Sequence, residues 1–551
     1  MRKNAKFIIF IPIFIGILFV LGKFTLVGAM NQVTQVTSSQ ITNSLEGNSY
    51  LPIIKNNACT VYPIESPFSI EIAALHQITS TNSIDQEIQD EQFYAWYNQA
   101  FPTLLSALKD SGAGWTRILV RWFEIEPNEP ALGTPPVYDP TWLQWYDDRI
   151  SQISQTGVKI IAVINSAPAW ANDSTSCPAI TPQHLQEYQQ FLTDIVTRYS
   201  QPPYNIKTWE IFNEADNTKP EKAYGVACFG NYSNLYAQVL STSYQTIKTV
   251  DPNATVLMSG IAYEAWTEPP YDGPFYRYFP DEVMNPLSGT SSFDALNFHY
   301  FPDFHKEWER WNPPAQSTCS RPPGDLGYPV YDGSGIDLIA KKNSFTNRMS
   351  TCYSVNKPVW VTELAQHGVI TDDGSLRNQA YYVITGYTRG LAAGIKNMTW
   401  FALAEPFNGD YQSLLYLDFS PKPAFYAYKT LVSQLTNYKY DRTLFSNFYS
   451  DPNNPYIYIY DNEAYVFKNS CNDEKIIAWG NNIPINISPA TSLDVTDFSG
   501  NVSTIEDGGT GDADGSKNGS IQVMLHSDPM QGSTVVSGPV SIPVFIHVTA
   551  P

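Results

Sequence analysis

The chain has 551 residues, too many for one compact hydrophobic core, which indicates a large domain accompanied by a smaller one. Only 16% of the residues are charged and the formal net charge is -20, which disfavours nucleic acids and anionic polymers as partners. Aromatic residues make up 14%, a share that fits an ordinary large core and a surface for stacking on sugars equally well.

The amino-terminal segment is predicted to direct export. Residues 1–6 are basic, and an uninterrupted apolar run follows at residues 7–21, which is short for a spanning helix and typical of a signal sequence. Residues 1–30 are therefore predicted to be a signal peptide or an N-terminal membrane anchor, tethered through residues 7–21. Either alternative places the protein outside the cell or on its surface. Residues 31–58, rich in Ser, Thr, Asn and Gln, are predicted to be a flexible linker.

Strand-like and helix-like segments alternate from residue 59 to residue 440, the pattern of parallel strands joined by crossover helices. Strands are expected at residues 68–75, 115–122, 158–165, 206–213, 255–261, 295–300, 359–363 and 398–403. Helices are expected at residues 90–111, 141–155, 182–199, 231–250, 336–354, 376–393 and 422–438. These units predict an α/β fold, a (β/α)8 TIM barrel, over residues 59–440.

Helical periodicity stops after residue 440. Short strands are expected at residues 456–460, 464–468, 475–479, 491–495, 521–525 and 544–548, separated by Asn, Gly, Asp and Pro. They predict a C-terminal β-sandwich domain over residues 441–551. A role in covering the flank of the barrel is favoured over a role in binding carbohydrate. The loop at residues 512–519 lacks the spacing and the closing glutamate of a calcium loop, so a glycine-rich hairpin is favoured there.

The six cysteines predict disulfides. No CxxC pair is present, which argues against zinc or thioredoxin-like chemistry, and an even number in an exported chain favours bridges. Two pairs follow from the loops in which the cysteines are expected, and the third is what remains: Cys177–Cys228, Cys319–Cys352 and Cys59–Cys471.

Two predicted strands end in a glutamate. The run TWEIFNEAD at residues 208–216 ends its apolar part in Asn213 and Glu214, and PVWVTE at residues 358–363 ends in Glu363. The carboxyl ends of all barrel strands meet at one face, so the two carboxyl groups are expected opposite each other. A pair of carboxylic acids is what cleavage of a glycosidic bond requires. A salt bridge would explain either glutamate alone, but the pair favours catalysis.

The segments WEIFNE (209–214), VWVTE (359–363), NFHY (297–300) and TRILVRW (116–122) resemble the strand 4, 7, 6 and 2 signatures of clan A glycoside hydrolases, such as families 5 and 39. The resemblance extends over residues 65–440. It implies a retaining glycoside hydrolase, with Glu214 as acid/base and Glu363 as nucleophile. Long aromatic loops after the fifth, sixth and seventh strands favour oligo- or polysaccharides as substrates. Ala215 stands where many relatives have proline, so the loop after the fourth strand is expected to differ.

Neighbouring polar residues are expected to support this pair. Arg117 is the candidate for a bidentate contact that keeps Glu363 ionised, and Glu210 is expected deeper in the barrel as the partner of a cation. The resemblance implies that Asn213 binds the sugar 2-hydroxyl. Strict alternation would turn Asn213 away, so the strand has to stop or bulge there.

Further site residues are expected at the ends of other strands. Tyr300 is a candidate donor to Glu363, and His299 a candidate contact for the sugar or Glu214. A pair of hydrogen-bonded core residues is the alternative explanation for both. The resemblance implies that Trp400 forms the aromatic floor under the sugar, and that Asn165 and Trp170 form a wall after the third strand.

Other classes of protein are less well supported. The seven histidines show no HExxH motif and no His-x-His on the first strand, and no GxSxG motif is present, which disfavours metal and serine hydrolases. A non-catalytic carbohydrate-binding protein of the cell surface and a transglycosylase remain as alternatives. We expect a monomer with a carbohydrate substrate and with no cofactor, bound metal or nucleic-acid partner. The sequence does not decide between endo and exo action.

Overall fold

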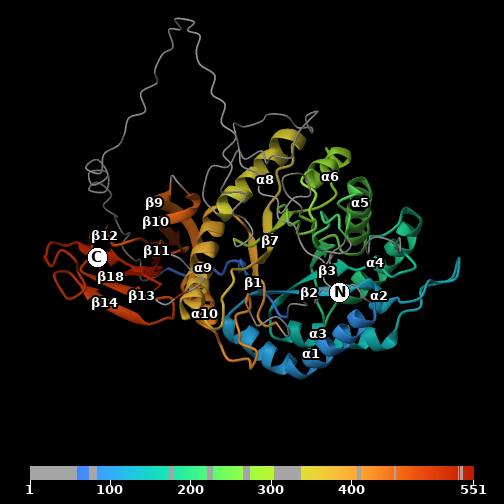
Figure 1. Ribbon diagram of the computed structural model, residues 1–551, viewed down its shortest axis with the longest axis horizontal. Helices are drawn as coiled ribbons and strands as arrows, with labels where there is room; N and C mark the ends of the chain where they lie inside the picture. The colour runs from blue at the N-terminus through green and yellow to red at the C-terminus, as the bar shows by residue number, and fades with distance from the viewer. Residues whose placement is uncertain are drawn as a thin grey trace, which may run out of the picture. The chain divides into compact units, whose positions relative to one another are not determined.

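Figure 1 shows a computed structural model of the chain. It describes residues 59–73, 83–172, 179–219, 228–264, 273–302, 337–405, 411–451, 454–530, 533 and 538–550. The predicted signal peptide or anchor and the linker, residues 1–58, lie outside these ranges. Within them, every helix is too short or too polar to cross a membrane.

Eight parallel strands form the barrel. They are β1 (Phe68–Glu71), β2 (Trp115–Arg121), β3 (Lys159–Asn165), β4 (Thr208–Ile211), β5 (Thr255–Leu257), β6 (Leu296–Tyr300), β7 (Val359–Leu364) and β8 (Asn397–Trp400). Their order in the sheet is β5-β4-β3-β2-β1-β8-β7-β6. Parallel bridges from Leu257 to Ala295 and from Ile261 to Phe298 join the two edge strands and close the ring. The predicted (β/α)8 barrel is confirmed.

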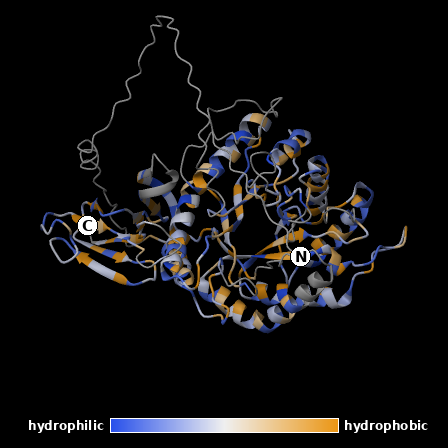
Figure 2. Cartoon of the chain, in the orientation of Figure 1, coloured by the Kyte–Doolittle hydropathy of each residue, from blue (hydrophilic) through white to orange (hydrophobic). Residues whose placement is uncertain are grey.

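Helices surround this ring (Figure 1). They are α1 (Ser83–Ser111), α2 (Trp122–Ile125), α3 (Pro140–Gln155), α4 (Leu185–Tyr199), α5 (Ser233–Val250), α6 (Phe279–Leu287), α8 (Leu338–Tyr353), α9 (Asp373–Ala392) and α10 (Pro423–Leu435). Figure 2 shows hydrophobic residues along the strands, and hydrophobic and hydrophilic residues alternating along the helices. Helix α6 was not predicted, because it has only nine residues and contains Pro286 inside the helix, where proline is disfavoured.

Side chains inside the barrel form two layers. At the amino ends of the strands, Trp115, Ile161, Leu257, Ala295 and Trp360 make a closed apolar cluster. Registered neighbours share a face in a parallel sheet, so Arg117 and Ile161 both point inward, as do Glu210 and Leu257. The next layer towards the carboxyl ends is therefore polar, and it lies on a packed apolar floor.

The C-terminal part is a β-sandwich, as predicted. A six-stranded antiparallel sheet has the order β14-β13-β18-β11-β10-β9, and a two-stranded sheet pairs β12 with β15. The strands are β9 (Lys439–Asp451), β10 (Asn454–Lys468), β11 (Glu474–Trp479), β12 (Ile483–Ile487), β13 (Ser492–Thr496), β14 (Val502–Glu506), β15 (Ile521–Leu525) and β18 (Val544–Ala550). A small third pair joins β16 (Ser527–Asp528) to β17 (Val540–Ser541). Three strands of the sandwich were not predicted. Strand β9 is rich in polar residues, β12 contains Pro484, and β14 is mostly exposed.

The six-stranded sheet contributes to two hydrophobic cores at once. In β10, Ala464 and Val466 face the interior of the sandwich, whereas Tyr465 and Phe467 belong to the core of the barrel. Strand β11 alternates in the same way, with Ala478 in the sandwich and Trp479 against the barrel. The domain therefore covers the flank of the barrel, which was the favoured role, and shares its core.

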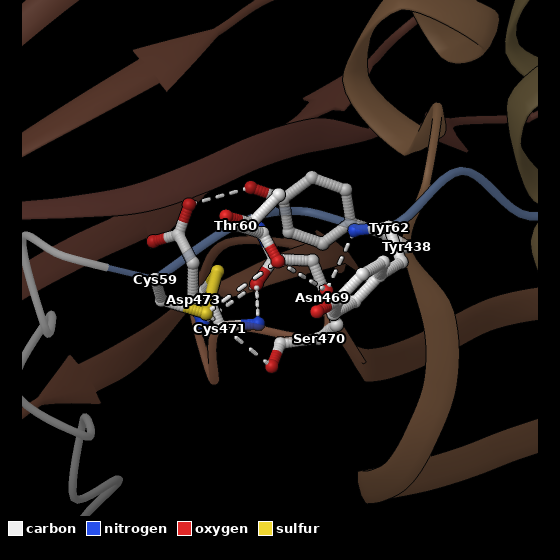
Figure 3. The surroundings of a disulfide bond; sticks show 8 residues. All are labelled: Cys59, Thr60, Tyr62, Tyr438, Asn469, Ser470, Cys471 and Asp473. Atoms are coloured by element: carbon white, nitrogen blue, oxygen red, sulfur yellow. Dashed lines mark hydrogen bonds between the residues drawn. A yellow bond between two sulfur atoms is a disulfide. The ribbon is translucent and has the colours of Figure 1, made fainter.

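One predicted disulfide is present in the described part of the chain. Cys59 is bonded to Cys471, in the loop between β10 and β11, with the Cα atoms 5.5 Å apart (Figure 3). Nearby, Ser470 Oγ accepts a hydrogen bond from the Tyr62 amide at 3.0 Å. Cys228 and Cys352 are also in disulfides, but their predicted partners Cys177 and Cys319 lie outside the described residues.

A buried ion network reinforces the contact between barrel and sandwich. Arg389 on α9 donates to Glu463 on β10 at 2.5 Å and to Asp337, which precedes α8, at 3.1 Å. The hydroxyl of Tyr465 donates to Glu463 as well. All three charged groups are nearly inaccessible to solvent, so each ion depends on its partners for the hydrogen bonds that water would otherwise supply.

We predict that Glu463→Ala lowers the free energy of unfolding by about 3 kcal/mol, because it leaves Arg389 short of a buried counter-charge. Urea unfolding followed by circular dichroism measures the loss. The matched control is Asp110→Ala, which removes the half-exposed pair with Lys429, and it should cost at most about 1 kcal/mol. Equal losses in the two variants would contradict the prediction.

Candidate active site

The end of β4 positions the first glutamate. The strand ends at Ile211, and Phe212 and Glu214 both have positive φ, 62° and 43°. These two left-handed residues break the alternation that would have turned Asn213 out of the barrel. As a result Asn213 Oδ1 accepts a hydrogen bond from Arg117 at 2.6 Å, and Glu214 reaches the same polar layer. The strand stops close to residue 213, as the sequence required.

A bulge in β7 positions the second glutamate. Val361 pairs with Phe298 on β6 but Glu363 pairs with His299, so Thr362 has no opposite residue. The extra residue turns two successive side chains inward. Thr362 contacts Asn297 and Glu210, and Glu363 contacts Arg117.

Arg117 organises the carboxylates of this layer. Its Nη1 lies 2.7 Å from Glu363 Oε1 and 2.8 Å from Glu71 Oε2. The bidentate contact goes to Glu210 instead, with both distances 3.0 Å. The predicted contact between Arg117 and Glu363 is thus present, but through one nitrogen. Glu210 is the deep partner of a cation that the sequence suggested.

His299 lies between the two glutamates. Its Nδ1 is 3.0 Å from Glu214 Oε1 and 3.4 Å from Glu363 Oε2, and its Nε2 is 3.3 Å from Thr362 Oγ1. Burial lowers the pKa of His299 well below 6.5, and the charges of Arg117 and Lys341 lower it further. The imidazole is therefore neutral near pH 7 and has one N–H to donate.

The carboxyl groups of Glu214 and Glu363 lie close enough for one proton to be shared between them. An oxygen of each and His299 Nδ1 all lie within 4.8 Å of one another. Burial raises the pKa of Glu214 well above its usual value, and the charges of Glu363, Asp216 and Glu264 raise it further. Burial raises the pKa of Glu363 too, but the charge of Arg117 and its hydrogen bond to Glu363 oppose that rise. Only Glu363 is in contact with Arg117, so a single shared proton resides on Glu214 and the charge on Glu363.

A second buried ion pair lies behind His299. Lys341 on α8 donates to the carbonyl oxygen of His299 at 2.7 Å and to Glu264 at 3.2 Å. Asp216 accepts from the amides of Ala262 and Tyr263. Burial raises the pKa of Asp216 to about 6. These groups fix the segment after β5 and add negative charge close to Glu214.

Tyr300 does not contact Glu363, contrary to the sequence-based expectation. Its hydroxyl donates to Asp337, on the helix side of the barrel wall. The reason is alternation along β6: His299 takes the inward position, so its neighbour Tyr300 faces the helices.

Trp400 is not an accessible floor either. It is 0% exposed, and its indole N–H donates to the carbonyl of Gln412 at 2.9 Å. Trp400 is registered with Ile70 on β1, and both belong to the apolar core outside the ring. The partly exposed aromatic side chain at this strand end is the next residue, Phe401.

The residues after β3 lie apart from the pair in their described contacts. Asn165 is buried at the end of the strand, in register with Arg121. Trp170 packs edge-on against Trp122 at 5.3 Å and donates to the carbonyl of Glu126 at 3.2 Å. Both support the wall of the barrel, and neither has a described contact with Glu214 or Glu363.

Several residues of the site were missed from the sequence. Glu71 closes the first strand as Glu363 closes the seventh, so the same criterion would have found it. Gly260 carries no such signal, yet a Cβ there would lie 2.1 Å from His299 Nε2 and 2.6 Å from Thr362 Oγ1. Only glycine leaves space for this histidine.

The family model described as Cellulase (glycosyl hydrolase family 5) matches residues 76–400. A family 39 glycoside hydrolase from the gut symbiont Bacteroides cellulosilyticus WH2 has a similar structure, with 19% identity, a TM-score of 0.52, and coverage of 81% of this chain and 77% of its own. The family 39 enzyme from Xanthomonas axonopodis pv. citri has 12% identity and a TM-score of 0.48, covering 88% and 95%. No curated protein matches by sequence. The first structural likeness shows a shared fold.

We predict that Gly260→Ala separates His299 from Glu214, because the new methyl group occupies the place of the imidazole. In a crystal structure of the variant, the distance from His299 Nδ1 to Glu214 Oε1 should exceed about 3.5 Å, the limit of a hydrogen bond. Gly394→Ala is the control: it has φ of 80° and nothing within 4 Å, so it strains the backbone without touching the site. An unmoved His299 in Gly260→Ala would contradict the prediction.

Proposed function

The chain belongs to glycosyl hydrolase family 5, the cellulase family, and from that premise we propose how its residues divide the work. It is a retaining glycoside hydrolase, which cleaves O-glycosidic bonds by double displacement. Glu214 is proposed as the acid/base and Glu363 as the nucleophile. The observation that carries this assignment is the placement of their oxygens within 4.8 Å of each other, with a cation on Glu363 only.

In the first step Glu363 attacks the anomeric carbon while Glu214 protonates the departing oxygen. Arg117 holds Glu363 Oε1 at 2.7 Å, which leaves Oε2 as the attacking atom. The O–C bond to the leaving group breaks, its electron pair takes the proton of Glu214, and an ester joins the sugar to Glu363. Negative charge on Glu363, Asp216 and Glu264 favours the protonated form of Glu214 until that moment.

In the second step the same residues act on water. Esterification removes the charge of Glu363, so the pKa of Glu214 falls and its carboxylate accepts a proton from water. The oxygen of this water attacks the anomeric carbon from the side that the leaving group occupied, and the bond to Glu363 breaks. Two successive inversions leave the configuration retained. The N–H of His299 stabilises the carboxylate of Glu214 during this step. A transglycosylase would use the same residues with a sugar hydroxyl in place of water.

Two further side chains are proposed to bind the sugar. Arg117 can only donate, so Asn213 presents its oxygen to Arg117 and its amide N–H2 is available for the 2-hydroxyl. Phe401, rather than Trp400, is proposed as the aromatic surface under the ring, because it is the partly exposed of the two.

Substitution of the two glutamates by alanine tests the roles separately. With an aryl glycoside that has a good leaving group, Glu363→Ala should lose at least about 100-fold in kcat, and azide should give a glycosyl azide of inverted configuration. In Glu214→Ala, azide should give the retained glycosyl azide, because the nucleophile is intact. Glu282→Ala, an exposed acid on α6, serves as the control. The opposite stereochemical outcomes would reverse the assignment.

The pH profile provides a further prediction. Activity requires a proton on Glu214 and none on Glu363, so kcat/KM should be bell-shaped, with its alkaline limb set by the raised pKa of Glu214. Removing the charge of Glu264 lowers that pKa, and Lys341, left without this partner, acts in the same direction. The alkaline limb of Glu264→Gln should therefore lie at lower pH. A limb that stays or rises would contradict the proposed acid.

Export is also proposed. It is supported by the apolar run at residues 7–21 and by the disulfides that hold Cys59, Cys228, Cys352 and Cys471, which are typical of oxidising compartments. Fractionation of cells that produce the full chain should place the activity in the medium or on the cell surface. Activity confined to the cytosol would contradict this.

A further inference from the structure

The atoms around His299 match the spacing of a zinc site. Zinc binds imidazole nitrogen and carboxylate oxygen at about 2.0–2.2 Å, so the ligand atoms of a tetrahedral site lie roughly 3.3 Å apart. His299 Nδ1 lies 3.0 Å from Glu214 Oε1 and 3.4 Å from Glu363 Oε2. One nitrogen and two oxygens, all within 4.8 Å of one another, can thus supply three of the four positions, and a water can complete the set.

The hydrogen bonds behind the histidine suit the same ion. A histidine that binds a metal through one nitrogen usually donates the other N–H to a fixed acceptor. Here His299 Nε2 lies 3.3 Å from Thr362 Oγ1, which in turn lies 3.2 Å from Glu210 Oε1. Glu363 keeps its second oxygen on Arg117, so its orientation is fixed as well.

The charge of the surroundings also favours a cation. Among the described residues, six carboxyl groups and two basic side chains are gathered around the histidine: Glu71, Glu210, Glu214, Asp216, Glu264 and Glu363, with Arg117 and Lys341. Glu214 is 17% exposed at its side chain, which gives a small ion access to this group. Negative charge of this density in a buried site has to be offset by protons or by bound cations.

We propose that Zn2+ binds between Glu214, His299 and Glu363 and inhibits the enzyme. The ion takes the place of the proton on Glu214, which is released to solvent, while the imidazole proton moves to Nε2. Since the ion occupies both catalytic carboxylates, it competes with the substrate. Inhibition rests on the proposed function of the two glutamates, whereas binding does not.

Isothermal titration with ZnCl2 tests the binding without any turnover. The full chain should bind one ion, and His299→Ala should bind it at least about tenfold more weakly. His547→Ala, which alters a partly exposed His–Asp pair on the sandwich, should bind as the parent does. His299→Gln keeps most of the side-chain volume and replaces His299→Ala if that variant fails to fold. Mg2+, which prefers oxygen ligands in an octahedron, should give no comparable binding.

Inhibition provides the second measurement. Zn2+ should raise the apparent KM for an aryl glycoside and leave kcat unchanged. Absence of zinc binding, or an affinity unchanged in both His299 variants, would overturn the proposal. Zinc binding that requires His299, in a chain whose glutamate variants keep full activity, would overturn the proposed function and leave the metal site standing.

Discussion

The interaction on which the site depends is that of Arg117 with Glu71, Glu210 and Glu363. One guanidinium, 1% exposed at its side chain, supplies the counter-charge for carboxylates from three strands of the barrel. Its planar fork fixes their relative positions, which a lysine with a single nitrogen would not do. It also distinguishes the two acids proposed for the reaction, because Glu363 touches this cation and Glu214 touches a neutral imidazole. Two chemically identical residues thereby acquire different proton affinities.

The backbone contributes to the same distinction by departing from regular strands. A plain β4 would have turned Asn213 away from Arg117, and a plain β7 would have placed only one of Thr362 and Glu363 inside the ring. Left-handed residues at the end of β4 and the bulge in β7 bring all of these side chains inward. The packed apolar cluster of Trp115, Trp360 and their neighbours supports these irregular segments from inside the barrel.

The eight strands and the two glutamates were predictable because apolar runs that end in a polar residue are visible in the sequence. Arg117 lies inside its strand and was proposed from the resemblance of residues 116–122 to the strand 2 signature. The orientations of Tyr300 and Trp400 were not, since a strand-end aromatic residue looks the same whether it faces the sugar or the helices. Gly260 contacts His299 from the segment after β5, and Lys341 contacts it from α8; such contacts arise only from the tertiary fold. Strand β9 was missed because its polar residues resemble a loop.

The alternation along β10 has an implication for the history of this enzyme. Tyr465 and Phe467 belong to the barrel while Ala464 and Val466 belong to the sandwich, so one strand serves two interiors. A domain attached in this way cannot readily be exchanged between genes. Its removal would expose hydrophobic surface on the barrel and on the sandwich. The barrel and the sandwich are therefore expected to have diverged together.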